Sequence, residues 1–392
     1  MADWSELSPE LLNDIHGRLR LLSRLAFAAV CVSWRDVHRA TPAGARKPEA
    51  PWLVLPDGGR RSARLFSLAD GRAVSVHVPR PPMRSRVVVG SSGGWLVTAD
   101  YWQSRLHLLN PFTGEQAELP ALTTMQCLDA APGGKVVFDF ADYTLIRLED
   151  SSRWRPSPPE TYSPSHLRHL FLRKVILSPS TRPPGGYEAM LLQCLGSGPA
   201  FATARDGEWT LAPSPHGVED AIYHDGQFFS VASTGVVESW RDIGCYGMYR
   251  STVVTSKLAK EDDWEMWKYL VESPAGQLMM VFREHDRDGK SSFFKVEILD
   301  EARGIWEEVP DIGDAALFVG INESLCLSTT EHPELRASCV YFTDDNIYAW
   351  MAKREPRDVG VYSLKDGIVK QIEALGPNWS WPPAAWITPC LV

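Results

Sequence analysis

The chain has 392 residues, 44% of them hydrophobic and 23% charged, and its formal net charge is −9. An acidic chain without a Lys/Arg tract argues against a protein that binds the phosphate backbone of nucleic acids. No apolar run approaches the roughly 18 residues of a transmembrane helix, and the first residues include Asp3 and Glu6 in place of the apolar core of a signal peptide. We therefore expect a globular protein of the cytoplasm or the nucleus, with neither a membrane nor a nucleic acid among its partners.

The cysteines indicate neither a disulfide framework nor a zinc site. No two of them have the spacing of a CxxC pair. We expect buried free thiols, and the seven positions are Cys31, Cys127, Cys194, Cys245, Cys326, Cys339 and Cys390.

The first forty residues predict a compact unit of short helices. Ser8 is placed to accept from the free N–H groups of a first helical turn, and Pro9 then occupies the first helical position, where its missing N–H costs nothing. Gly17 is expected to end this helix. One apolar stripe runs along it, formed by Leu11, Leu12, Ile15 and Leu19.

A second helical segment follows, with Ser23 as its expected N-cap. Its apolar residues repeat at spacings of three, four and seven, and they are Phe27, Val30, Cys31, Trp34 and Val37. A unit of about forty residues buries such a face poorly by itself. It either docks onto a partner protein or caps the domain that follows, and periodicity alone favours neither.

Beyond residue 51 the chain predicts strands. Residues 41–51 have the composition of a linker, and short β-branched and aromatic runs separated by Gly, Pro, Asp and Asn follow them. In one recurring pattern a glycine precedes a hydrophobic strand. Its copies begin at Gly94, Gly134, Gly186, Gly226 and Gly276, at intervals of 40, 52, 40 and 50 residues.

A second pattern joins two strands through a polar turn, and its clearest copy runs from Leu106 to Pro120. A period of roughly 45 residues with about four short strands is typical of a propeller blade. The chain beyond the linker has room for about seven blades, with six large ones possible, and a pair of β-sandwiches is the alternative. Further copies of the turn lie at Asp70-Gly71, Asp206-Gly207, Arg303-Gly304 and Asp366-Gly367, where a glycine supplies positive φ.

The sequence thus predicts a mainly β protein, with a helical domain at 1–40, a linker at 41–51 and a propeller at 52–392. Gly90-Ser91-Ser92-Gly93-Gly94 fits G-x-S-x-G, but a nucleophile elbow needs a helix after the turn, and Trp95–Thr98 continues as a strand. Asp286–Lys290 begins like a calcium loop without flanking helices. We expect neither an enzyme nor a metal or cofactor site.

The N-terminal unit resembles an F-box. The match consists of Leu7-Ser8-Pro9-Glu10-Leu11-Leu12, Ile15, Arg18-Leu19 and Val30-Cys31-x-x-Trp34-Arg35, within roughly residues 4–40. The family usually has Leu-Pro at Ser8-Pro9, and a second proline at Arg20.

The body resembles the plant F-box-associated β-propeller of the KIB type. The resemblance rests on Asn110-Pro111-Phe112-Thr113-Gly114, on Leu119-Pro120 and on the C-terminal third. The matching segments of that third are Ala316–Gly320, Ser324–Ser328, Cys339–Asp345, Asp358–Tyr362 and Trp381–Trp386.

The two resemblances together imply the substrate-recognition subunit of a Skp1–cullin–F-box ubiquitin ligase. The F-box would bind a Skp1-type adaptor, and through it a cullin, while the propeller would bind an unknown target protein. The alternative is an interaction module outside any ligase, with a helical cap. By resemblance, the candidate adaptor-facing residues are Leu7, Pro9, Leu11, Leu12, Ile15, Leu19, Phe27, Val30, Cys31 and Trp34.

Overall fold

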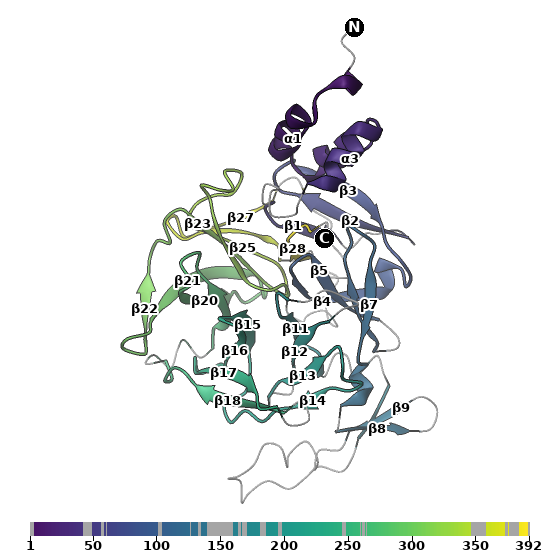
Figure 1. Ribbon diagram of the computed structural model, residues 1–392. Coiled ribbons are helices and arrows are strands. Elements are labelled where there is room, and N and C mark those ends of the chain that lie inside the picture. Colours follow the sequence, from purple (N-terminus) through teal and green to yellow (C-terminus); the bar gives the residue numbers. More distant parts are fainter. Residues whose placement is uncertain are drawn as a thin grey trace, which may run out of the picture.

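A computed structural model describes most of the chain (Figure 1). The described residues are 4–41, 49–55, 59, 61–100, 104–125, 127–131, 135–138, 160–163, 166, 171–180, 186–194, 198–244, 248–258, 260, 263, 265–345, 358–372, 375 and 384–390.

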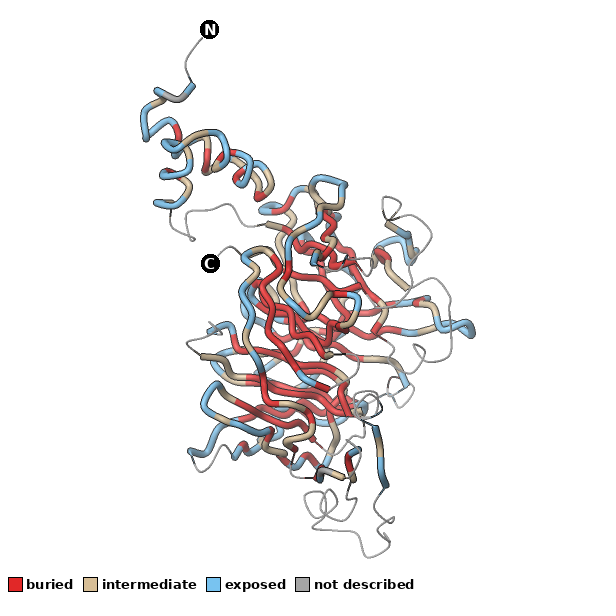
Figure 2. The backbone as a smooth tube through the Cα atoms, turned by 90° about the vertical axis from the view of Figure 1, so that its right-hand side faces the viewer, coloured by how far each residue is buried: buried red, intermediate tan, exposed pale blue. Residues whose placement is uncertain are grey.

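Three helices and a short 3₁₀ turn form a head that projects from a β-rich body (Figures 1 and 2). Figure 2 shows that most buried residues lie in the body, whereas much of the head is exposed. The head contains η1 (Trp4–Glu6), α1 (Pro9–Arg18), α2 (Leu21–Ala28) and α3 (Val32–Ala40).

The body contains seven sheets in the part of the chain that is described, and six of them form the blades of a ring. In hydrogen-bonded order, blade 1 has β28 (Ala385–Ile387), β1 (Trp52–Leu55), β2 (Ser62–Ser67) and β3 (Arg72–His77). Blade 2 has β4 (Arg86–Ser92), β5 (Trp95–Asp100), β6 (Leu106–Leu109) and β7 (Gln116–Leu119). Blade 3 has β11 (Lys174–Leu177), β12 (Glu188–Leu192), β13 (Ala200–Thr203) and β14 (Thr210–Leu211).

Blades 4 to 6 continue the ring. Blade 4 has β15 (Asp220–His224), β16 (Gln227–Val231), β17 (Val237–Asp242) and β18 (Tyr249–Val253). Blade 5 has β19 (Trp267–Glu272), β20 (Leu278–His285), β21 (Ser291–Asp300) and β22 (Ile305–Val309). Blade 6 has five strands, β24 (Leu325–Ser328), β23 (Ala315–Val319), β25 (Cys339–Phe342), β26 (Gly360–Ser363) and β27 (Ile368–Gln371). Two 3₁₀ turns, η3 (Met83–Ser85) and η4 (Leu122–Thr124), lie between strands.

Apolar clusters join each blade to the next all the way around the ring. One cluster holds side chains of blades 1 and 2, another holds blades 2 and 3, and so on to blades 6 and 1. The last strand closes the ring, because β28 pairs antiparallel with β1 through Leu53 and Trp386. This arrangement confirms the predicted β-propeller and rules out the pair of sandwiches.

The seventh sheet lies outside the ring. It has three strands, β8 (Leu128–Ala131), β9 (Lys135–Phe138) and β10 (Glu160–Tyr162), and projects from the rim beside blades 2 and 3 (Figure 1). Blades 2 and 3 are direct neighbours, because a Cβ on Gly90 of β4 would lie only 2.0 Å from the carbonyl oxygen of Val175 in β11. The ring therefore has six blades, the lower of the two predicted numbers.

The two patterns found in the sequence correspond to two different hairpins within a blade. The glycine-then-strand pattern enters the second strand of blades 2 to 5, as at Gly226 between β15 and β16. The polar turn joins the last two strands, and the positive φ expected there is present at Gly71, Gly114, Gly304 and Gly367. The same expectation is wrong for Gly207 in the turn between β13 and β14, which does not have positive φ.

Candidate docking surface

The first helix of the head begins as its sequence predicts. The Ser8 hydroxyl accepts from the backbone N–H of Leu11 at 3.4 Å, and Pro9 is the first helical residue. The helix ends at Arg18, next to the predicted stop at Gly17. The N-cap predicted at Ser23 is wrong, because α2 begins two residues earlier, at Leu21.

The structure divides the ten candidate residues into a core and a surface. Leu12 and Phe27 are 0% and 2% exposed and form the centre of the head with Val37. These side chains hold the three helices together. Four further candidates pack around this centre and are half-buried, namely Leu7, Ile15, Leu19 and Trp34.

The other candidates lie at the surface of the head. Leu11 and Val30 are 54% and 56% exposed, Pro9 is exposed and Cys31 is half-buried. Three more apolar side chains of the head, which were not among the candidates, are also exposed: Trp4 is 64%, Leu25 43% and Val32 67% exposed. Val32 follows Cys31 directly, and the Trp34 indole N–H donates to the carbonyl of Trp4 at 3.0 Å. We call Trp4, Leu11, Val30 and Val32 the exposed apolar set.

The head is attached to the propeller through the first turn of α2. No local side chain caps this helix. Instead, the Glu49 carboxylate accepts from the backbone N–H of Leu21 at 2.5 Å and lies 3.1 Å from the Arg24 guanidinium. Both charged side chains are almost fully buried, and burial raises the pKa of Glu49 against the opposing effect of its hydrogen bonds. A carboxylate also suits the positive end of the helix dipole.

A second contact attaches α2 to blade 6, the last blade of the ring. Arg20, where the F-box family usually has proline, forms an ion pair with Glu334 of the β24–β25 connection at 3.3 Å. Leu21 also packs into the apolar cluster between blades 1 and 2, which includes Ala385 and Ile387 of β28. Arg20 therefore has a structural partner in this chain, on blade 6.

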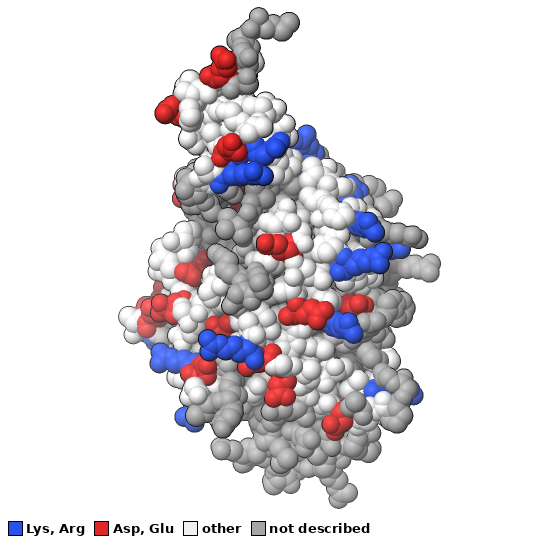
Figure 3. All heavy atoms as spheres, turned by 45° about the vertical axis from the view of Figure 1, so that its right-hand side comes forward, with Lys and Arg blue, Asp and Glu red and all other residues white. Residues whose placement is uncertain are grey.

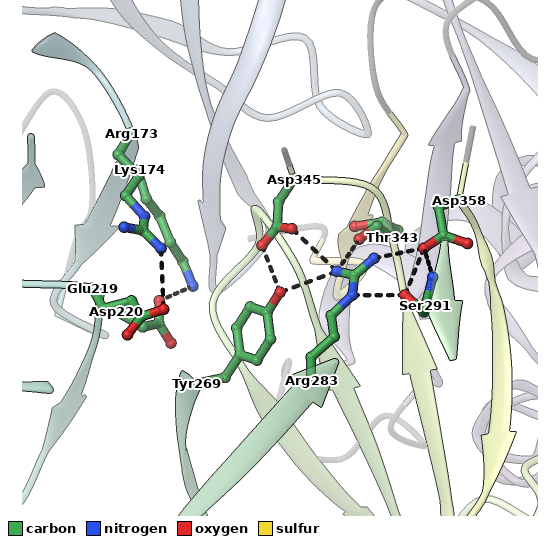
Figure 4. Close-up of polar contacts among 10 residues, drawn as sticks. All are labelled: Arg173, Lys174, Glu219, Asp220, Tyr269, Arg283, Ser291, Thr343, Asp345 and Asp358. Carbon is green, nitrogen blue, oxygen red and sulfur yellow. Dashed lines mark hydrogen bonds and ion pairs between the residues drawn. The ribbon is translucent and has the colours of Figure 1, made fainter. Parts of the chain in front are cut away.

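A buried polar network joins blades 5 and 6 (Figure 4). Arg283 of β20 is 1% exposed and lies 3.1 Å from Asp345 and 3.0 Å from Asp358, both of blade 6. The Tyr269 hydroxyl donates to Asp345, and the Ser291 backbone N–H donates to Asp358. Each buried charge in this network has a partner of opposite sign. The network therefore holds the two blades together without leaving a buried charge unpaired, which would be destabilising.

A second group of charges joins blades 3, 4 and 5 near the axis (Figure 4). Lys174 of β11 lies 2.6 Å from Asp220 of β15, and the other oxygen of Asp220 accepts from the Leu270 backbone N–H of β19 at 3.1 Å. Next to them, Arg173 lies 3.9 Å from Glu219. The inner strands are thus linked by charge as well as by apolar packing.

The turn between β23 and β24 contacts blade 2, which is not the neighbour of blade 6 in the ring. The backbone N–H of Glu323 donates to the carbonyl of Ser91 in blade 2 at 3.0 Å, although blade 1 separates blades 6 and 2 around the ring. Burial raises the pKa of Glu323 to about 7, against a hydrogen bond from Ser92 and the charge of Lys174. Groups of blades 2, 3 and 6 meet here, so Glu323 lies at the axis.

The two motifs that resembled catalytic or metal sites have structural roles. Ser91 and Ser92 end β4, and Gly93-Gly94 turn directly into β5, so no helix follows the serines. Asp286 closes the β20–β21 hairpin by accepting from the backbone N–H groups of Asp288 and Lys290. Within the described residues, no cluster of three or more His, Cys, Asp or Glu side chains is placed to hold a metal ion.

Surface charge is mixed on the face of the molecule drawn in Figure 3. On the face drawn in Figure 3, acidic and basic side chains are interspersed, and neither sign forms a continuous patch there. Among the helices that the structure describes, none combines the length and apolar character needed to span a membrane.

The chain is similar to plant F-box proteins. A family model described as the KIB1-4 β-propeller matches residues 65–363. F-box protein SKIP23 of Arabidopsis thaliana is 24% identical over 99% of this chain and 96% of the relative. A second Arabidopsis F-box protein is 24% identical over 99% of this chain and 95% of its own length, and a third, named as a putative F-box protein, is 25% identical over 88% and 91%. The matches to the first two relatives span 99% of this chain and so include both the head and the body.

Solved structures resemble the chain only distantly. A putative 6-phosphogluconolactonase from Bacteroides uniformis aligns with 86% of this chain and 99% of its own, at 11% identity and a TM-score of 0.36. A likeness at this level carries no argument about activity.

Proposed function

Because the chain belongs to the KIB1-4 β-propeller family, we propose that it is the substrate-recognition subunit of a Skp1–cullin–F-box ubiquitin ligase. The head binds a Skp1-type adaptor, which connects it to a cullin, and the propeller binds the target protein. Both the match of the family model and the whole-length similarity to relatives named as F-box proteins support this role.

The exposed apolar set is the observation that carries the proposal. The centre of the head is already filled by Leu12 and Phe27, so its packing does not require Leu11 or Val30. Apolar side chains that stay exposed on so small a unit favour a protein partner. An adaptor that covers them would bury surface the fold leaves open, and the hydrophobic effect would drive that association.

The attachment of the head supports a rigid receptor. Glu49 and Glu334 hold α2 at two points, one at the entry to blade 1 and one on blade 6. A target on the propeller would therefore keep a defined position relative to the adaptor. The protein itself makes and breaks no covalent bonds in this proposal. Its contribution is proximity, because it holds target lysines near the ubiquitin carrier.

Co-purification with a Skp1-type adaptor tests the proposal. The wild-type chain should bind the adaptor, and the double variant Leu11→Asp/Val30→Asp should lose binding by about tenfold or more, because two charges would enter an apolar contact. Val253→Asp in blade 4 is the matched control, since Val253 is also 54% exposed. It should bind the adaptor like the wild type.

Two outcomes contradict the ligase role. One is a wild-type chain that does not bind the adaptor, and the other is a double variant that binds it as well as the control does. Either would favour the alternative, a propeller interaction module with a helical cap. The proposal places the protein in the cytoplasm or the nucleus, which imaging of a fluorescent fusion would test.

A further inference from the structure

A groove opens at the seam between the first and the last blade. Its volume is about 490 Å³, within the range of pockets that hold drug-sized ligands or a few amino-acid residues. Its floor is apolar and aromatic, with Phe66 and Tyr341 on facing blades. The residues that line it include Phe66, Tyr341, Val361, Arg336, Lys370 and Gln371.

The rim of the groove is positively charged. Arg336 and Lys370 are both exposed, and neither side chain forms an ion pair with a described residue. The described lining residues include no Asp or Glu. Although the chain has a net charge of −9, the described rim of this apolar floor carries two exposed cations. They complement a ligand that combines carboxylates with an apolar side chain.

The edge of the groove suits an extended polypeptide. Lys370 and Gln371 belong to β27, which is the outermost strand of blade 6 in the part of the chain described. The outer edge of such a strand offers backbone N–H and C=O groups to a further strand. A small carboxylate would use the cations alone, whereas a protein segment would use the cations, the floor and the strand edge together.

We propose that this groove, at the seam of blades 1 and 6, binds a short segment of the target protein in which acidic residues flank an apolar side chain. The inference rests on the proposed function, since it names the class of target that the propeller recognises. The carboxylates lie against Arg336 and Lys370, and the apolar side chain lies on Phe66 and Tyr341.

The groove lies on the two blades that carry the head. Glu334, which pairs with Arg20, is two residues from Arg336, and Glu49 is three residues before Trp52, where β1 of blade 1 begins. A segment bound here would therefore lie close to the contacts that fix the head. This position allows the receptor to hold its target next to the adaptor.

Fluorescence anisotropy with three sets of short synthetic peptides tests the proposal on the full chain bound to the adaptor. The first set places Asp or Glu around Leu or Phe, the second replaces the acids with Lys, and the third replaces the apolar residue with Ser. Only the first set should bind the wild type. Arg336→Glu/Lys370→Glu should weaken that binding by about tenfold or more.

A matched control separates the groove from general charge. Arg205→Glu/Arg250→Glu reverses two exposed cations on blades 3 and 4 and should keep the wild-type affinity. Equal binding of the acidic and basic peptide sets, no binding of the first set, or equal loss in both double variants would overturn the proposal. Binding of a free dicarboxylate as tightly as the peptides would overturn it in favour of a small ligand.

The adaptor test distinguishes this proposal from the ligase role. Arg336→Glu/Lys370→Glu should still co-purify with the adaptor and melt at the wild-type temperature, because both residues are exposed. If the wild type fails to bind the adaptor but binds the acidic peptides as free chain, the ligase role fails and the groove stands. If it binds the adaptor but no peptide, the groove fails alone.

Discussion

The Glu49 carboxylate lies 3.1 Å from the Arg24 guanidinium and caps the helix to which Arg24 belongs. The pair is nearly inaccessible to solvent and joins the head to the start of blade 1. Removing one member of a buried ion pair leaves the other charge without compensation, which costs about 3–5 kcal/mol.

Glu49→Ala should therefore release α2 from the propeller while the ring stays folded. Hydrogen exchange of the α2 amides should rise strongly, with no change in the amides of β20 or β21. Asp14→Ala is the control, since it removes an exposed pair with Arg18 worth at most about 1 kcal/mol. Equal protection of α2 in both variants would contradict the role given to Glu49.

Leu11 and Leu12 are adjacent in sequence but should respond differently to truncation. Leu12→Ala leaves a cavity in the centre of the head and should cost about 2–5 kcal/mol. Leu11→Ala should change stability by less than about 0.5 kcal/mol, because its side chain is already 54% exposed. Chemical unfolding followed by the helical circular dichroism signal measures both, and similar losses would contradict the division into core and surface.

Arg20→Pro should be tolerated. The backbone of Arg20 has φ −78° and that of Leu19 has ψ 145°, and both suit a proline at position 20. The variant loses the partly exposed pair with Glu334, worth about 0.2–1 kcal/mol, and gains a similar amount from a more restricted unfolded chain. The free energy of unfolding should stay within about 1 kcal/mol of the wild type, and a larger loss would show that Glu334 holds the head more firmly than its exposure implies.

Arg283→Met should destabilise the ring at the boundary of blades 5 and 6. The substitution leaves Asp345 and Asp358 without their cation, so the expected cost is about 3–5 kcal/mol. Arg303→Met removes an exposed pair with Glu307 on β22 and serves as the control, with an expected effect below about 1 kcal/mol. Urea unfolding followed by tryptophan fluorescence measures both variants.

Glu323 should make stability depend on pH. Its pKa in the folded protein is about 7, raised by burial from an ordinary value of 4.5. Below the ordinary value the carboxyl is neutral in both states and carries no penalty. As pH rises toward the folded pKa the unfolded state ionises more readily, and stability falls by up to about 3 kcal/mol.

Glu323→Gln should remove this dependence. Relative to the wild type, the variant should gain stability between about pH 5 and about pH 8. Glu301→Gln changes an exposed carboxylate on blade 5 and should leave the wild-type profile in place. Parallel pH profiles for wild type and Glu323→Gln would contradict the raised pKa of Glu323.

The propeller was predictable because its hairpins carry their own turn chemistry. Gly71 and Gly304 occupy positive-φ positions that the sequence marks directly. The number of blades was less certain, since β9 follows the same glycine pattern as the second strand of a blade. Only the packing of β4 against β11 shows that this sheet lies outside the ring.

In the head, the sequence predicted the helices but not which of their apolar residues are buried. Helical spacing groups Leu11 with Leu12 in one stripe, but the position of α3 decides which of them is covered. The contact between α2 and Glu49 joins residues 28 positions apart. No local sequence pattern in the Pro- and Ala-rich linker predicts it. The groove at the seam likewise depends on blades from opposite ends of the chain.

Ring closure also determines when, during synthesis of the chain, the head can be fixed in place. The head is translated before the propeller, but the apolar cluster that receives Leu21 contains Ala385 and Ile387 of β28. That strand is translated after every other strand of the ring. A nascent or prematurely terminated chain therefore has a finished head on an unfinished support, and only a completed propeller fixes the head in its working position.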